Sequence, residues 1–264
     1  MKLVDTHAHL DFFIRRGELA QIAAEARAAG VERVITPSTS PENWLEYERA
    51  ARESGGFISW QIGIHPSDID ENSNLALDAL AGFAASDTPP VAVGEIGLDF
   101  HFLPNDKEQA AQIIRRQREI FRRQLMLAAD LNLPVCVHAR EAVDDAIAAM
   151  REVDFDFSRA VFHCFSGSVE QIGLLNSLGA RASFTGIITY KNAAEMRECM
   201  LRQGLEKIMF ETDCPYLSPE PVRKSVNKPA NIAYTVRFAA ELFGVSAEEL
   251  AGISSANAGG FFRI

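Results

Sequence analysis

Segments of strand and helix character alternate along the whole chain, and this alternation restricts the possible folds more than any other feature. Short apolar runs rich in Val, Ile and Phe are separated by segments with helical spacing and by Gly or Pro breaks. The sequence predicts eight strands, at 3–7, 31–39, 57–66, 91–99, 133–138, 160–165, 180–186 and 207–213. The predicted helices lie at 17–29, 41–54, 74–85, 106–132, 141–152, 168–178, 192–202 and 229–243, and a last one begins at 246.

Six residues that can hold metal lie at the ends of predicted strands. The run VDTHAHL (4–10) carries two histidines at i and i+2, which point to the same side of an extended chain. The other four come one per strand end. The full set is His7, His9, Glu95, His138, His163 and Asp213.

The scatter of these residues over the chain decides between two α/β architectures. An open doubly wound sheet places its ligands at one switch point between strands. Here the metal-type residues come from the first, fourth, fifth, sixth and eighth strands. Only closure into a ring brings those strand ends to one face. We therefore expect a single-domain (β/α)₈ TIM barrel spanning residues 1–264, a usual length for such a barrel.

The residue types indicate metal-assisted hydrolysis. Six ligands are too many for one catalytic ion that must keep a position open for water. Two divalent ions about 3.5–4 Å apart would use all six if one carboxylate bridges them. Mixed imidazole and carboxylate donors suit Mg, Mn or Zn, and Fe as well. We expect Asp213, on the last strand, to contact the ion that holds the attacking water and to accept its proton.

The net charge of the chain indicates how it would bind nucleic acid. The chain has 26 basic and 36 acidic residues, a net charge of −10, which argues against a broad basic footprint for duplex DNA. We expect weak affinity for nucleic acid, with a preference for single strands or ends.

The four cysteines form no CxxC pair, which fits buried free thiols and a reducing cytoplasm. No apolar stretch is long enough to predict a membrane span. The RRQREIFRR run (115–123) is expected to be the solvated face of an outer helix.

Several motifs together resemble the TatD family of metal-dependent deoxyribonucleases, within the amidohydrolase-like barrels. They are DTHAHLD (5–11), GIHPSD (63–68), VGEIGLDF (93–100), QL (124–125), LPVCVHAREA (133–142), HCFSG (163–167), TGIITYKN (185–192), FETDCPYLSP (210–219), NKPANI (227–232) and Asn257. The resemblance covers nearly the whole chain and implies cleavage of phosphodiester bonds in DNA, as a 3′→5′ exonuclease.

The resemblance also implies roles for individual residues. One metal would be held by His7, His9, Glu95 and Asp213, and Glu95 would bridge to a second metal held by His138 and His163. A glutamate at position 95 separates this chain from relatives that bridge with a carbamylated lysine. The residues implied in substrate binding are His65, facing the substrate phosphate, and Arg140 and Arg223, near the phosphate-binding mouth.

Two segments depart from the family pattern. The stretch PVRKSVNKPANI (221–232) has Lys228 where a glutamate is usual and an altered run from Lys224 to Val226. The loop HFLPNDKEQ (101–109) differs from the expected aromatic-rich version. Both segments are expected to line the substrate entrance. The departures therefore concern which substrate is bound, and they do not change the expected hydrolytic reaction.

Two alternative functions remain open at this stage. The same site could cleave amide or ester bonds, as amidohydrolase-like barrels do, or remove amino acids from mischarged tRNA. The second alternative, and the third possibility beside the nuclease, is a binding or scaffold protein that keeps the metal site without turnover. That reading requires a missing ligand, and none of the six is missing.

Overall fold

A ring of eight parallel strands forms the centre of the molecule. The computed structural model describes all residues, 1–264, and orders the strands β1 to β8 with each paired to the next in sequence. The strands are β1 (Leu3–Asp5), β2 (Val31–Pro37), β3 (Ile58–Ile62), β4 (Ala92–Asp99), β5 (Val135–Arg140), β6 (Ala160–Phe162), β7 (Arg181–Phe184) and β8 (Met209–Phe210).

Backbone hydrogen bonds join the last strand segment to the first. The N–H of Thr6 donates to the carbonyl of Phe210 at 3.2 Å, and the N–H of Asp213 donates to the carbonyl of His7 at 2.9 Å. The predicted (β/α)₈ barrel is therefore confirmed, and its carboxyl-terminal strand ends share one face.

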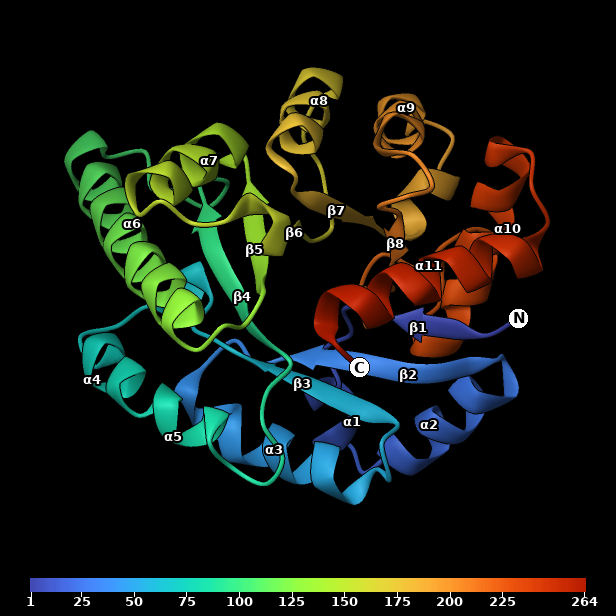
Figure 1. Cartoon of the computed structure of the whole chain (residues 1–264), viewed down its shortest axis with the longest axis horizontal. Coiled ribbons are helices and arrows are strands. Elements are labelled where there is room, and N and C mark those ends of the chain that lie inside the picture. The colour runs from blue at the N-terminus through green and yellow to red at the C-terminus, as the bar shows by residue number, and fades with distance from the viewer.

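Helices surround the strands on the outside (Figure 1). They are α1 (Asp11–Ile14), α2 (Leu19–Ala28), α3 (Trp44–Glu53), α4 (Ser73–Asp78), α5 (Leu80–Ala84), α6 (Lys107–Asp130), α7 (Val143–Glu152), α8 (Val169–Leu178), α9 (Ala194–Gln203), α10 (Ile232–Phe243) and α11 (Ala247–Phe262). The helix expected at 74–85 is divided into α4 and α5, and the one-turn helix α1 was not anticipated. No helix combines the length and the apolar character needed to cross a bilayer.

The start and outer face of α6 follow from its sequence. The Asp106 carboxylate accepts the N–H of Gln109 at 2.8 Å and so caps the helix at its N-terminus. Arginines of the 115–123 run form ion pairs with acidic residues of neighbouring helices, among them Arg118 with Asp145 and Arg122 with Glu152. The arginines of this run lie on the charged outer face of the helix, as expected, whereas Gln117, Ile120 and Phe121 of the same run are buried.

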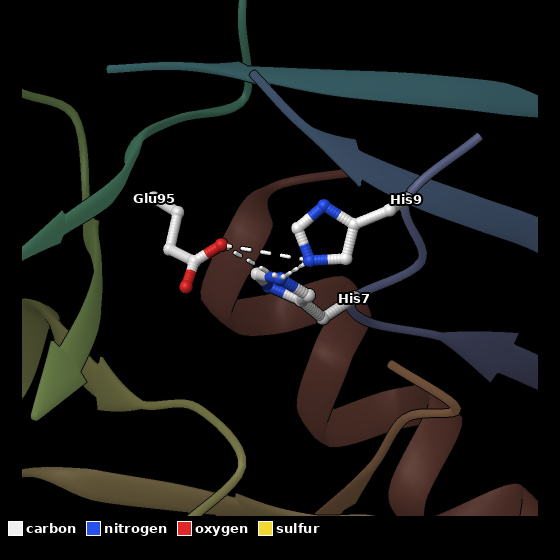
Figure 2. A group of neighbouring side chains, drawn as sticks. All are labelled: His7, His9 and Glu95. Carbon is white, nitrogen blue, oxygen red and sulfur yellow. Dashed lines mark hydrogen bonds and ion pairs between the residues drawn. The ribbon is translucent and has the colours of Figure 1, made fainter. Parts of the chain in front are cut away.

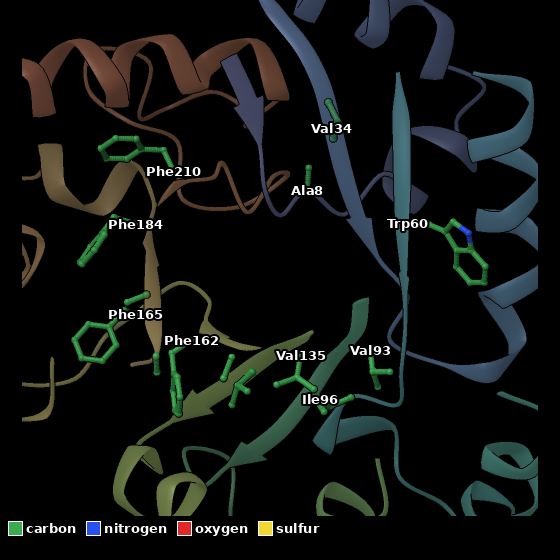
Figure 3. Close-up of a cluster of buried hydrophobic side chains, with 14 of the residues drawn as sticks. Ala8, Val34, Trp60, Val93, Ile96, Val135, Phe162, Phe165, Phe184 and Phe210 are labelled. Atoms are coloured by element: carbon green, nitrogen blue, oxygen red, sulfur yellow. The ribbon is translucent and has the colours of Figure 1, made fainter. Parts of the chain in front are cut away.

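The apolar core has two layers. The larger one lies between the strands and the helices, and Figure 3 shows some of its residues, including Val34, Trp60 and Phe162. A smaller cluster fills the barrel interior, where Ile35 and Met209 pack with Phe261 and Phe262 of α11. Helix α11 thus closes the end of the barrel away from the carboxyl-terminal strand ends. Burial on both sides of the strands fixes the positions from which the site residues project.

Candidate metal centre

The structure brings all six predicted metal ligands together at the carboxyl-terminal face of the barrel. His7 and His9 follow β1, Glu95 and His138 belong to β4 and β5, and His163 follows β6 directly. Asp213 follows β8. Five separate strand ends therefore contribute to one group of side chains, as the ring closure predicts.

Glu95 lies at the centre of this group, and its two carboxylate oxygens face different histidines. Oε2 is 3.3 Å from Nε2 of His7 and 3.7 Å from Nε2 of His9 (Figure 2). Oε1 is 2.9 Å from Nδ1 of His138 and 2.8 Å from Nε2 of His163. One carboxylate thus separates two pairs of imidazole nitrogens.

Asp213 joins the first pair. Its Oδ1 lies 3.3 Å from Nε2 of His9 and 3.9 Å from Nε2 of His7. The first group therefore offers two imidazole nitrogens and two carboxylate oxygens, and the second offers two imidazole nitrogens and the other oxygen of Glu95.

Both carboxylates are held in the ionised form. Burial acts to raise the pKa of Glu95, but the neighbouring histidines, His163 first among them, outweigh it and hold that pKa well below its usual range. Burial also acts to raise the pKa of Asp213, and the hydrogen bond and charge of His9 outweigh it and lower that pKa. The centre thus concentrates negative charge beside the histidines.

This donor set fits divalent cations. Oε2 of Glu95 is a buried, ionised oxygen with no hydrogen-bond partner. Two imidazole nitrogens, of His7 and His9, face each other at 3.3 Å beside it. A cation among these atoms would satisfy the unpartnered oxygen and both nitrogen lone pairs at once.

Two carboxylates that sequence reasoning did not select lie beside the second pair of histidines. Oδ2 of Asp99 is 3.0 Å from Nε2 of His138, and Oε1 of Glu211 is 3.5 Å from Nδ1 of His163. The hydrogen bond to Asp99 favours a proton on Nε2 of His138, so Nδ1 of that ring turns a lone pair toward Glu95. Nδ1 of His163 has no hydrogen-bond partner, so Glu211 acts on that ring through its charge alone. Both are buried. Asp99 is four residues after Glu95 and Glu211 is two before Asp213, so strand alternation was the signal that could have found them.

The cysteines largely match expectation. All four are free, and Cys136, Cys199 and Cys214 are buried. Sγ of Cys136 lies 3.5 Å from Nδ1 of His7, where it takes the place that carboxylates hold at the other two histidines. Cys164 is only partly buried and lines the cavity above the centre.

A cavity of about 1080 Å³ opens above the centre. His65, one of the three predicted substrate-binding residues, lines it with its Nε2 3.4 Å from Oε1 of Glu95. Arg140, the second, is on its wall. Arg223, the third, lies outside this lining, with its guanidinium stacked 3.5 Å from the ring centroid of Tyr190. The role of Arg223 in substrate binding stays a prediction.

Comparison with known proteins agrees with this geometry. The family described as TatD related DNase matches residues 4–263. This chain belongs to the TatD family. It is 33% identical to YabD of Bacillus subtilis over 99% of each chain, and 33% identical to YcfH of Escherichia coli over 100% of this chain and 97% of that one. Both relatives are named as uncharacterized metal-dependent hydrolases.

The TatD fold is also found in a solved structure. The crystal structure of YjjV, a TatD homologue of Escherichia coli, superposes with a TM-score of 0.89 and 29% identity, covering 99% of this chain and 98% of that one. Family, fold and donor set together make this TatD protein a metal-dependent hydrolase.

Proposed function

We propose that the protein hydrolyses phosphodiester bonds of DNA with two divalent metal ions, and that it removes nucleotides from the 3′ end. The observation that carries this proposal is the position of Glu95, whose two oxygens face two separate pairs of histidine nitrogens. A carboxylate in that position can bridge two ions. Two-ion centres stabilise both the attacking and the leaving oxygen in displacement at phosphorus.

The residues divide between the two ions as follows. His7, His9 and Asp213 would hold the first ion and His138 and His163 the second, and Glu95 would serve both. Nitrogen and oxygen donors in this mixture suit Mg, Mn or Zn. When bound, such ions lower the pKa of water and offset the charge of a phosphate group.

Asp213 is the residue suited to accept the proton from the attacking water. Its lowered pKa keeps it ionised at neutral pH. It lines the cavity beside His9, so its carboxylate faces the space that the reacting phosphate would occupy. A carboxylate ionised at working pH and within reach of the nucleophile can act as the general base.

His65 is suited to donate a hydrogen bond to the substrate phosphate. Its Nδ1 accepts the N–H of Ser67 at 3.1 Å, which places the proton of a neutral ring on Nε2. That N–H points into the cavity near Oε1 of Glu95. Arg140 supplies a positive charge on the cavity wall, and guanidinium groups bind phosphate oxygens in a planar, paired geometry.

DNA is the substrate favoured by the description of the family as DNase-related. With a net charge of −10, the chain has no general attraction for a polyanion. We therefore propose binding of single strands or ends, with most of the affinity coming from the metal centre and the cavity walls.

The test is digestion of a single-stranded oligonucleotide labelled at its 5′ end, with Mg²⁺, Mn²⁺ or Zn²⁺, and with EDTA. We expect products that shorten from the 3′ end, and loss of cleavage with EDTA and in Asp213→Ala. Asp130→Ala, which removes an exposed carboxylate at the end of α6, serves as the matched control and should cleave normally. A metal-loaded protein that leaves DNA intact but cleaves esters or aminoacyl-tRNA would contradict the proposal.

A further inference from the structure

The loop between β4 and α6 projects an aromatic ring into the cavity wall. Phe102 is 72% exposed and is among the residues that line the cavity. Leu75 of α4 has the same exposed fraction but lies outside the cavity lining. A large apolar side chain that is exposed inside a reaction cavity is a candidate contact for the substrate.

This loop is tied to the metal centre through one carboxylate. Oδ1 of Asp99 accepts the N–H of His101 at 2.9 Å, while Oδ2 of the same residue faces Nε2 of His138 at 3.0 Å. The His101 ring pairs with Glu141, with 2.6 Å between Nδ1 and Oε1, and packs edge to face against Phe102 at 4.8 Å. These contacts connect the Phe102 ring, through His101 and Asp99, to His138 of the metal centre.

The guanidinium of Arg140 lies over this ring in a cation–π contact. Its guanidinium carbon is 5.0 Å from the ring centroid of Phe102, and its side chain has no hydrogen bond or ion pair. The other two arginines that line the cavity are engaged, Arg15 with Asp11 and Arg16 with Glu18. An exposed ring and an unpaired cation thus stand together at the ends of β4 and β5.

We propose that Phe102 and Arg140 form a platform for a nucleobase of the nucleotide next to the scissile phosphate. Phe102 stacks on the face of the base, and Arg140 contacts the adjoining phosphate. The inference rests on the proposed nuclease function and specifies how its substrate is held. Stacking recognises the face that every base presents, so the platform tolerates any sequence but requires an unpaired, unstacked base.

The platform also accounts for nucleic-acid binding by an acidic protein. Apolar contact with bases does not depend on net charge, whereas a general electrostatic footprint does. Tyr216 follows β8, which lies across the ring from β4 and β5. Its side chain is 62% exposed and lines the cavity from that side. The metal centre lies between these two walls, where a phosphate flanked by two nucleosides would fit.

The test compares oligonucleotides with and without bases. Two single-stranded substrates of equal length and charge are used, one of ordinary DNA and one in which the two residues at the 3′ end are abasic. Hydrolysis is measured as kcat and KM, and binding as fluorescence anisotropy in Ca²⁺. The variants are Phe102→Ala, Phe102→Tyr as the conservative replacement, and Leu75→Ala as the control for loss of an equally exposed apolar side chain.

We expect Phe102→Ala to raise KM and Kd about tenfold for ordinary DNA and to leave both unchanged for the abasic substrate. Phe102→Tyr and Leu75→Ala should match the original protein on both substrates. An equal effect of Phe102→Ala on the two substrates, or no effect, would overturn the platform while the nuclease function stands. Base-dependent binding without cleavage would support the platform and refute the nuclease proposal. Neither binding nor cleavage would refute both.

Discussion

At the scale of single residues, the centre depends on carboxylates that orient histidines as much as on the ligands themselves. Asp99 and Glu211 each face the outer nitrogen of one histidine, and His7 has a thiol in the same position. Carboxylate acceptors raise the basicity of an imidazole and fix the direction of its lone pair. Of these three histidines, His138 has the shortest such contact, 3.0 Å to Asp99.

Replacement of Asp99 by asparagine should weaken metal binding without disturbing the fold. Asparagine keeps an oxygen that can accept the N–H of His101, but it removes the charge that favours a proton on Nε2 of His138. We expect metal affinity to fall about 10- to 100-fold, with hydrolysis partly restored at high metal concentration. Calorimetric metal titration measures the change. Asp106→Asn, at a helix cap where asparagine serves equally well, should bind metal normally, and equal affinities in the two variants would refute the orienting role.

At the scale of elements, α6 supports the strand ends next to the site. Gln124 accepts the N–H of Ile64 at 2.7 Å and donates to its carbonyl at 3.1 Å, and Gln117 bonds both backbone groups of Asp99 in the same way. These buried amides provide hydrogen-bond partners for two residues whose backbone groups have left the strand pairing, Ile64 just before His65 and Asp99 at the end of β4. The helix thereby fixes the loops that carry His65 and Phe102.

Replacement of Gln124 by leucine should destabilise the protein strongly. Two buried backbone groups of Ile64 would lose their partners, at a cost of about 3 kcal/mol in the free energy of unfolding. Urea denaturation followed by circular dichroism measures this change. Gln112→Leu alters an exposed position of the same helix and should cost much less. Similar losses in both variants would show that the buried amide is not responsible.

The altered residue Lys228 has a structural partner. It forms an ion pair with Glu25 of α2, and this contact joins α2 to the segment before α10. Hydrogen bonds from Lys228 and Gln21 lower the pKa of Glu25 below its ordinary value of 4.5. The pair therefore stabilises the fold above that pH, and the stabilisation is lost as the pH falls through the lowered pKa.

Lys228→Met should lower the free energy of unfolding by about 0.5 kcal/mol at pH 7, a small value because the side chains of the pair are 38% and 33% exposed and water screens their charges. The difference from the original protein should shrink as the pH falls below 4.5 and through the lowered pKa of Glu25. Unfolding curves at several pH values measure it, with Lys191→Met as the control for loss of an unpaired lysine. A difference that persists at low pH would mean that charge pairing is not its source.

The sequence predicts the elements better than it predicts the contacts between them. Hydrophobic runs and helix caps such as Asp106 are local signals, so the strands and most helices could be placed. The ligands were found because histidine and carboxylate at strand ends are distinctive. The orienting role of Asp99 and the position of Phe102 depend on which loops meet across the barrel mouth, and no local pattern contains that information. The stacking of Arg223 on Tyr190 likewise joins two distant segments.

At the scale of the whole molecule, closure of the barrel creates the site. Backbone hydrogen bonds from Thr6 to Phe210 and from Asp213 to His7 join the first strand to the last. His7, His9 and Asp213 meet only because of that closure, and Glu95 reaches them from the opposite side of the ring. Helix α11 fills the other end of the barrel. The central claim is that one carboxylate, Glu95, joins two metal ions at this closed ring.

Electron paramagnetic resonance of the metal-free protein titrated with Mn²⁺ tests that claim most directly. Two ions bridged by Glu95, about 3.5–4 Å apart, should give the spectrum of an exchange-coupled pair after two equivalents are bound. Glu95→Gln should lose the coupled spectrum together with hydrolysis. Binding of a single ion, or of two ions with uncoupled spectra in the original protein, would contradict the account.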